Sequence, residues 1–75
     1  MHRFLIIIER SADGYGAYSP DLPGCVAVGE TRNEVESNMY QAISLHLEGL
    51  KEDGLPIPPG EALAEYIVVP ETAGT

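Results

Sequence analysis

Residues 31–54 have the sequence TRNEVESNMYQAISLHLEGLKEDG and carry a helix start, a helical period and a helix stop in that order. Thr31 and Glu34 match a capping box, in which the Thr31 hydroxyl accepts from the Glu34 amide and the Glu34 carboxylate reaches back to the Thr31 amide. Gly54 suits the left-handed conformation that ends many helices. The sequence therefore predicts one helix over residues 32–53, about 30 Å long.

An apolar stripe runs along this helix at steps of three and four residues, the spacing of a helix that covers a core with one face. Most polar residues of the segment fall on the other faces. The sequence thus predicts that the helix packs one side against a sheet. The stripe consists of Val35, Met39, Ala42, Ile43, His46, Leu47 and Leu50.

Three short segments before the helix have the composition of strands. Residues 3–10 are rich in β-branched side chains, residues 15–19 follow a Ser-Ala-Asp-Gly turn, and residues 25–28 are a third apolar run. Residues 20–24 read Pro-Asp-Leu-Pro-Gly, whose last two residues suit the centre of a type II turn. We expect an antiparallel sheet in which the first two segments form a hairpin.

The segments after the helix complete the predicted order of elements. Three prolines in residues 55–60 exclude a helix or a central strand, so these residues are expected to form an extended connector. Residues 65–69, Glu-Tyr-Ile-Val-Val, read as a last strand. The order β-β-β-α-β predicts an α+β fold of two layers, an antiparallel sheet with one long helix on one face. One domain is expected over residues 1–70, followed by a flexible tail at residues 71–75.

Charge and size limit the classes of function. The chain has 75 residues, and twelve acids against four bases give a net charge of −8, the reverse of what phosphate binding requires, so we expect no direct contact with nucleic acid. The apolar run over residues 4–8 is too short for a signal peptide or a membrane span. Cys25 has no second cysteine to pair with, which fits a reducing cytoplasm.

A chain of this size forms a marginal core, since it buries only about 60–65% of its unfolded surface. With neither a disulfide nor a Cys/His metal cluster in the sequence, association is the expected source of further stability. One helix covers one face of the sheet only, so the other face is expected to meet a partner if it is apolar. We therefore predict a homo-oligomer or a permanent complex with another chain.

Candidate catalytic groups are few and scattered. Cys25 would need a base, and the single internal histidine, His46, falls on the apolar stripe of the helix. Asp13 and Asp21 lie in turn-rich segments, where aspartate commonly makes local hydrogen bonds. We expect a protein that is not an enzyme, with no catalytic, cofactor or metal site. A small metal-dependent hydrolase remains the less favoured alternative.

Three sequence blocks, in this order and spacing, resemble the HicB-like antitoxin family: YSPDLPGC at residues 18–25, GETRNE at residues 29–34, and DGLPIPP at residues 53–59. The resemblance implies a fold similar to a truncated ribonuclease H fold without its active site. It also implies a small basic, HicA-like toxin that cleaves messenger RNA as the partner, and a dimer or a tetramer as the homo-oligomer. Members of the family often carry a DNA-binding segment at the C-terminus, whereas only six residues follow Val69 here, so we expect no operator binding.

If the antitoxin interpretation holds, the chain would mask the RNA-binding face and catalytic histidine of the toxin. The tightly turned loop that follows the second strand is a rigid place to present contacts, although it could equally serve only to turn the chain. A self-associating module without a toxin remains the alternative function. The candidate contacts are Tyr18, Asp21, Leu22, Pro23, Gly24 and Glu30.

Overall fold

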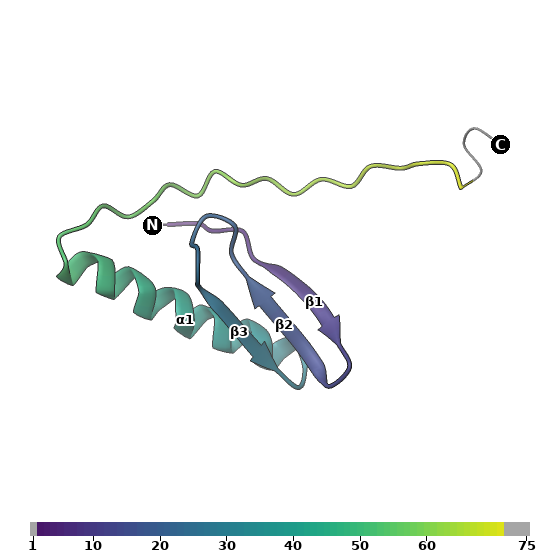
Figure 1. Cartoon of the computed structure of the whole chain (residues 1–75), viewed down its shortest axis with the longest axis horizontal. Coiled ribbons are helices and arrows are strands. Elements are labelled where there is room, and N and C mark those ends of the chain that lie inside the picture. Colours follow the sequence, from purple (N-terminus) through teal and green to yellow (C-terminus); the bar gives the residue numbers. More distant parts are fainter. Residues whose placement is uncertain (1, 72–75) are drawn as a thin grey trace.

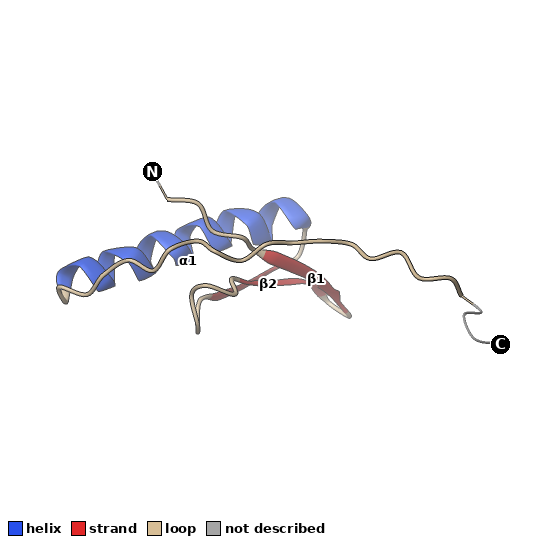
Figure 2. Cartoon of the chain, turned by 90° about the horizontal axis from the view of Figure 1, so that it is seen from above, coloured by secondary structure: helices blue, strands red, loops and turns tan. Residues whose placement is uncertain are grey.

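A computed structural model describes residues 2–71 and contains three strands followed by one helix (Figure 1). The strands β1 (Ile7–Ser11), β2 (Gly14–Tyr18) and β3 (Val26–Gly29) form an antiparallel sheet in the order β1-β2-β3. The helix α1 (Arg32–Glu52) forms a second layer on one face of this sheet (Figure 2). The predicted class, an α+β fold with an antiparallel sheet and one long helix, is confirmed.

The start of α1 follows from its capping residues. Thr31 Oγ1 accepts a hydrogen bond of 3.0 Å from the Glu34 amide, as predicted. The Glu34 carboxylate reaches one residue further back than predicted, because it accepts from the Glu30 amide, at 2.9 Å, and not from Thr31. A Cβ built on Gly29 would lie 2.6 Å from the Val35 backbone nitrogen, so a glycine is needed where β3 meets α1.

The end of α1 is a Schellman motif, which closes the free carbonyls of the last turn. Gly54 has a φ of +69°, and its amide donates to the Lys51 carbonyl at 3.1 Å. The Leu55 amide donates to the Leu50 carbonyl at 2.9 Å. The helix therefore ends within one residue of the predicted boundary.

The loop between β2 and β3 consists of two successive turns. The Leu22 amide donates to the Ser19 carbonyl at 3.1 Å, and the Cys25 amide donates to the Leu22 carbonyl at 3.0 Å. Gly24 has a φ of +82°, the conformation that a type II turn requires at this position. The Ser19 hydroxyl is buried and donates to the Leu5 carbonyl at 2.8 Å, which fastens the loop to the segment before β1.

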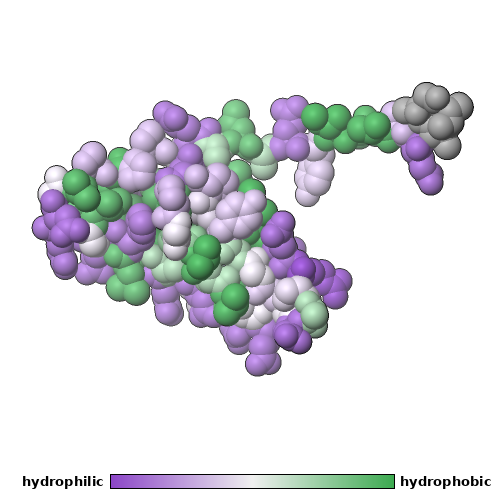
Figure 3. Space-filling view, viewed as in Figure 1, coloured by the Kyte–Doolittle hydropathy of each residue, from purple (hydrophilic) through white to green (hydrophobic). Residues whose placement is uncertain are grey.

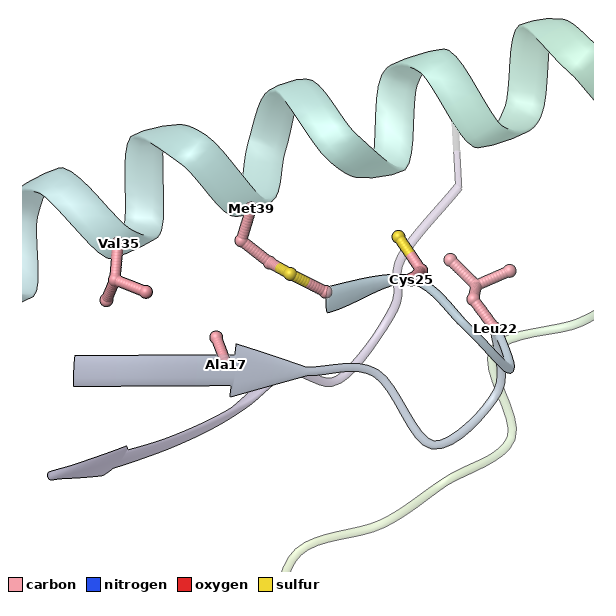
Figure 4. Packing of buried hydrophobic residues seen from close by; sticks show 5 residues of the cluster. All are labelled: Ala17, Leu22, Cys25, Val35 and Met39. Atoms are coloured by element: carbon pink, nitrogen blue, oxygen red, sulfur yellow. The ribbon is translucent and has the colours of Figure 1, made fainter. Parts of the chain in front are cut away.

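The core lies between α1 and the inner face of the sheet (Figure 4). Part of the predicted helix stripe is confirmed, since Val35 and Met39 are fully buried and Ala42, Ile43 and Leu47 pack against the cluster. The loop adds a fully buried side chain, that of Leu22. The buried cluster consists of Ala17, Leu22, Cys25, Val35 and Met39.

The predicted last strand is wrong for the isolated chain. Residues 65–69 are assigned no strand within the described residues, and the Tyr66 side chain is 99% exposed. A strand needs a neighbour to pair its amides and carbonyls, and here the extended chain runs past the sheet (Figure 1). The radius of gyration of 15.6 Å, against about 11 Å for a compact chain of this length, reflects that projection.

Residues 55–60 are neither helix nor strand, in agreement with the predicted connector. Of the predicted tail at residues 71–75, residues 72–75 lie outside the described residues. No helix in residues 2–71 combines the length and the apolar character that a membrane span requires.

Candidate partner-binding surface

The face of the sheet that points away from α1 carries exposed apolar side chains. Successive residues of a strand point to opposite faces, so the buried side chain of Ala17 faces the helix and that of Tyr18 faces outward. Tyr18 is 40% exposed, Val26 64% and Val28 74%. Patches of apolar surface lie over the strands in Figure 3. We define the outer face by the residues Ile7, Glu9, Gly16, Tyr18, Val26 and Val28.

The strand register brings these residues into two rows. Tyr18 pairs with Ile7 on one side and Val26 on the other, which forms a continuous apolar row across all three strands. Gly16 lies between Glu9 and Val28 in the second row. A Cβ built on Gly16 would lie 4.0 Å from its nearest neighbouring atom, the Ala27 carbonyl oxygen. The glycine therefore leaves free space on the outer face, which a larger side chain could occupy. A side chain of a partner therefore has room to enter there.

The edge of the outer face at β3 is held in place by α1. The Asn38 side chain amide donates to the Val28 carbonyl at 2.8 Å. This bond satisfies a carbonyl on the outer edge of the sheet and fixes β3 against the helix. The exposed Val28 side chain is thus presented from a rigid backbone, which lowers the entropy lost on binding.

An acidic hollow of about 500 Å³ adjoins the outer face at the far end of β3. Its lining includes Asp13, Glu30 and Glu34 together with Val28, which also belongs to the outer face. The Glu34 carboxylate accepts from the Glu30 amide and so keeps one oxygen engaged within the hollow. Three carboxylates beside an apolar surface suit a basic side chain of a partner.

The structure separates the six predicted contact residues. Tyr18 lies on the outer face, and Pro23 and Gly24 are exposed in the turn that leads into β3. Glu30 is exposed at the opposite end of β3, in the acidic hollow. Leu22 has a fully buried side chain and therefore supports the loop from inside the core. It cannot contact a partner in this conformation.

Asp21 is bonded within the chain, to the segment that follows α1. Its Oδ2 accepts a hydrogen bond of 3.0 Å from the amide of Ala62, 41 residues further along the chain. The carboxylate therefore fastens the segment after α1 to the loop between β2 and β3. Asp21 is half-buried in this position. Its hydrogen bond in the structure therefore holds the segment after α1 in place.

Sequence reasoning missed Val26 and Val28 as surface residues. The run Cys25-Val26-Ala27-Val28 is apolar throughout, so it gives no polar residue to mark the exposed side. The signal that could have found them is the small Ala27, since a small residue fits beneath a helix that crosses the sheet closely. This places the two valines on the opposite side by strand alternation.

The groups considered for catalysis lie in separate environments. Cys25 is buried, and burial raises the pKa of its thiol above the usual value, which favours the unreactive protonated form. His46 is half-buried on α1. Within residues 2–71, no three His, Cys, Asp or Glu residues gather where a metal ion could be held.

These features define a small α+β binding module, in which a helix packs one face of a short sheet and the other face is apolar and open. The sequence model described as "HicB_like antitoxin of bacterial toxin-antitoxin system" matches residues 4–75. The chain therefore belongs to the HicB-like antitoxin family, as the three sequence blocks indicated.

Similar proteins and structures agree with this assignment. An uncharacterized 14.9 kDa protein of Haemophilus phage HP1 is 42% identical over 66 residues, which cover 88% of this chain and 50% of the phage protein. A UPF0150 protein of Synechocystis is 30% identical over 70 residues, covering 92% of this chain and 89% of that protein. The chain thus spans half the length of the phage protein and most of the cyanobacterial one.

Two solved structures share the fold. The crystal structure of the antitoxin HicB3 has a TM-score of 0.67 and 32% identity, covering 79% of this chain and 44% of that one. A chain of the HicA3 and HicB3 toxin-antitoxin complex has a TM-score of 0.64 and 33% identity, covering 73% of this chain and 64% of that one. Both similarities agree with an α+β fold of three antiparallel strands followed by one long helix.

Proposed function

We propose that this chain binds and neutralises a small basic toxin that cleaves messenger RNA, by covering the face with which the toxin holds RNA. Membership of the HicB-like antitoxin family supports the antitoxin role. The similarity to a chain of a HicA3 and HicB3 complex supports a HicA-like toxin as the partner. In this role the chain acts by occlusion and performs no chemistry.

The exposed apolar outer face is the observation that carries the proposal. Interfaces typically combine an apolar centre with a polar rim, and aromatic residues contribute much of the binding energy. Tyr18, Val26 and Val28 supply the centre, and Glu30 lies on the rim at the far end of β3. The net charge of −8 attracts a basic partner and speeds the encounter.

The loop between β2 and β3 forms the second part of the proposed contact. Pro23 and Gly24 are exposed in a type II turn next to Val26, so a partner on the outer face also reaches this turn. Leu22 and Asp21 support the turn from within, through the buried side chain and the bond to Ala62. Of the six residues predicted from the sequence, four are proposed as direct contacts: Tyr18, Pro23, Gly24 and Glu30. The other two, Asp21 and Leu22, are proposed to support the loop.

Binding to a HicA-like protein tests the proposal. The variant Val28→Asp places a charge on the apolar part of the outer face, and we expect it to weaken toxin binding at least about 30-fold, the effect of losing a main contact of the interface. Titration calorimetry measures the dissociation constant, and growth of cells that express the toxin measures neutralisation. Leu45→Asp is the matched control, since Leu45 is an exposed leucine on α1, 68% accessible and remote from the outer face.

The two variants also separate the proposed surface from a general effect of added charge. If Leu45→Asp weakens binding as much as Val28→Asp, the toxin does not select the outer face. If both variants bind as the unchanged chain does, the outer face has no part in neutralisation. Circular dichroism confirms that each variant keeps its fold before binding is compared.

A further inference from the structure

We propose that residues 65–69, which we call the arm, form a strand against the outer edge of β1 in a second copy of the chain, so that two copies exchange arms. The proposal concerns self-association and does not depend on toxin binding. It is carried by three observations: an exposed strand-like segment, an unpaired sheet edge of the same length, and an apolar groove beside that edge.

The arm has the composition of a buried strand and the exposure of a free segment. Tyr66 is 99% exposed, Ile67 80%, Val68 96% and Val69 68%. β-branched and aromatic residues favour strands that pack on both faces. An arm of this kind leaves apolar side chains and backbone donors unsatisfied by protein contacts, so it gains stability when it joins a sheet.

The receiving edge is that of β1. Within residues 2–71, β1 pairs with β2 alone, because the sheet order is β1-β2-β3. Its opposite edge therefore offers a row of backbone amides and carbonyls. β1 has five residues, and the arm has five residues, so one strand can pair with the other along its whole length.

A groove of about 460 Å³ lies beside this edge, between β1 and α1. Most of its lining is apolar, with Ile8 of β1 and the preceding Ile6 on one side and Tyr40 and Ile43 of α1 on the other. The ion-paired side chains of Arg32 and Glu36 lie at the same groove. Ile6, Ile8 and Ile43 pack against the core but are only partly buried, so the core is open to solvent along this groove. A strand added to β1 would point alternate side chains into the groove and close the core.

The path of the connector directs the arm toward a second copy. The Ala62 amide is held by Asp21, and Gly60 and residues 62–64 line one hollow with residues 3–5, so the chain is fastened beside the segment before β1. Beyond that point the chain continues past the sheet while β1 turns away (Figures 1 and 2). Between residues 61 and 69 there is neither glycine nor proline to favour a sharp bend back to β1.

Reciprocal exchange satisfies both arms at once. Two copies related by a twofold axis each give one arm and receive one, which is the closed arrangement of most homodimers. The exchanged strand lies at the β1 edge, whereas Val26 and Val28 lie on β3 at the opposite edge. The dimer therefore leaves the β3 side of the outer face open to a toxin.

Analytical ultracentrifugation of the full chain is the first test. We expect a dimer at micromolar concentration, and Val68→Lys in the arm should raise the dimer dissociation constant at least about tenfold, because the pairing buries a charge. Leu45→Lys, an exposed residue outside the arm and the groove, should leave the constant unchanged. A monomeric chain, or equal effects of the two variants, would overturn the proposal.

A mixed-label experiment shows which copy receives the arm. A nitroxide is placed on Glu65→Cys in a Cys25→Ala chain, and this chain is mixed with an unmodified, ¹⁵N-labelled chain. We expect broadened amide signals from β1 of the ¹⁵N-labelled copy, since the nitroxide then lies beside it. A dimer in which these signals stay sharp, or broaden only when both labels are on one chain, would overturn strand exchange. Broadening that requires added toxin would also overturn it.

Discussion

The two faces of the sheet differ in what covers them, although neighbouring residues of the same strands supply both. Toward α1, Ala17 is 5% exposed, and Val35 and Met39 of the helix are fully buried against it. On the outer face, Val28 is 74% exposed. Apolar residues on the first face stabilise the fold, while those on the second remain available for binding. Apolar strand composition in a small domain can therefore serve a partner as well as a core.

Truncating a side chain at the centre of the covered face should lower the free energy of unfolding most. Met39→Ala should lower the free energy of unfolding by about 2–5 kcal/mol, because it removes a fully buried side chain and leaves a cavity. Urea denaturation followed by circular dichroism measures the loss. Leu45→Ala, on an exposed face of the same helix, should change it by about 0.5 kcal/mol or less. Similar losses for both variants would show that α1 does not pack as described.

Two valines, one buried in the core and one exposed on the outer face, allow the same comparison of stability with a single residue type. Val35→Ala removes a fully buried side chain and should cost about 2 kcal/mol, reduced slightly by the better helix propensity of alanine. Val28→Ala should cost about 0.5 kcal/mol or less. Thermal and urea denaturation of the two variants measure the difference. If Val28→Ala costs as much as Val35→Ala in the unbound chain, another layer already covers the outer face.

The helix was predicted almost completely, because its signals are local. Thr31, the apolar period and Gly54 act on backbone groups within a few residues, so the observed range of residues 32–52 differs from the predicted range of residues 32–53 at one end only. The turn at Pro23-Gly24 was predicted for the same reason, since its geometry depends on two residues.

Strand limits depend on partners and were predicted less well. The first strand was expected at residues 3–10 and lies at Ile7–Ser11, because its ladder exists only opposite β2. The arm has strand composition, but no partner strand faces it within the described chain. The orientation of Leu22 was also missed, since a Pro-Gly pattern predicts a turn but not which side chain turns inward.

Cys25 lies on the covered side, and of the residues compared its thiol should change the stability least. Burial raises the pKa of its thiol in the folded chain above the usual 9.0. The folded state therefore keeps its proton to a higher pH than the unfolded state, and the thiol's contribution to stability is present below pH 9 and is lost as the pH rises through the folded pKa. Between pH 8 and pH 10.5 the unchanged chain should lose slightly more stability than Cys25→Ala.

Comparing the two chains isolates the thiol, because they differ only at residue 25. Urea denaturation at each pH gives the two slopes, and Ellman's reagent gives an independent measure, since a buried thiol should react slowly until urea unfolds the chain. Equal slopes together with rapid labelling of the native protein would place Cys25 at the surface. The covered face would then be more accessible to solvent than the full burial of Met39 and Val35 implies. Its contrast with the outer face would be correspondingly smaller.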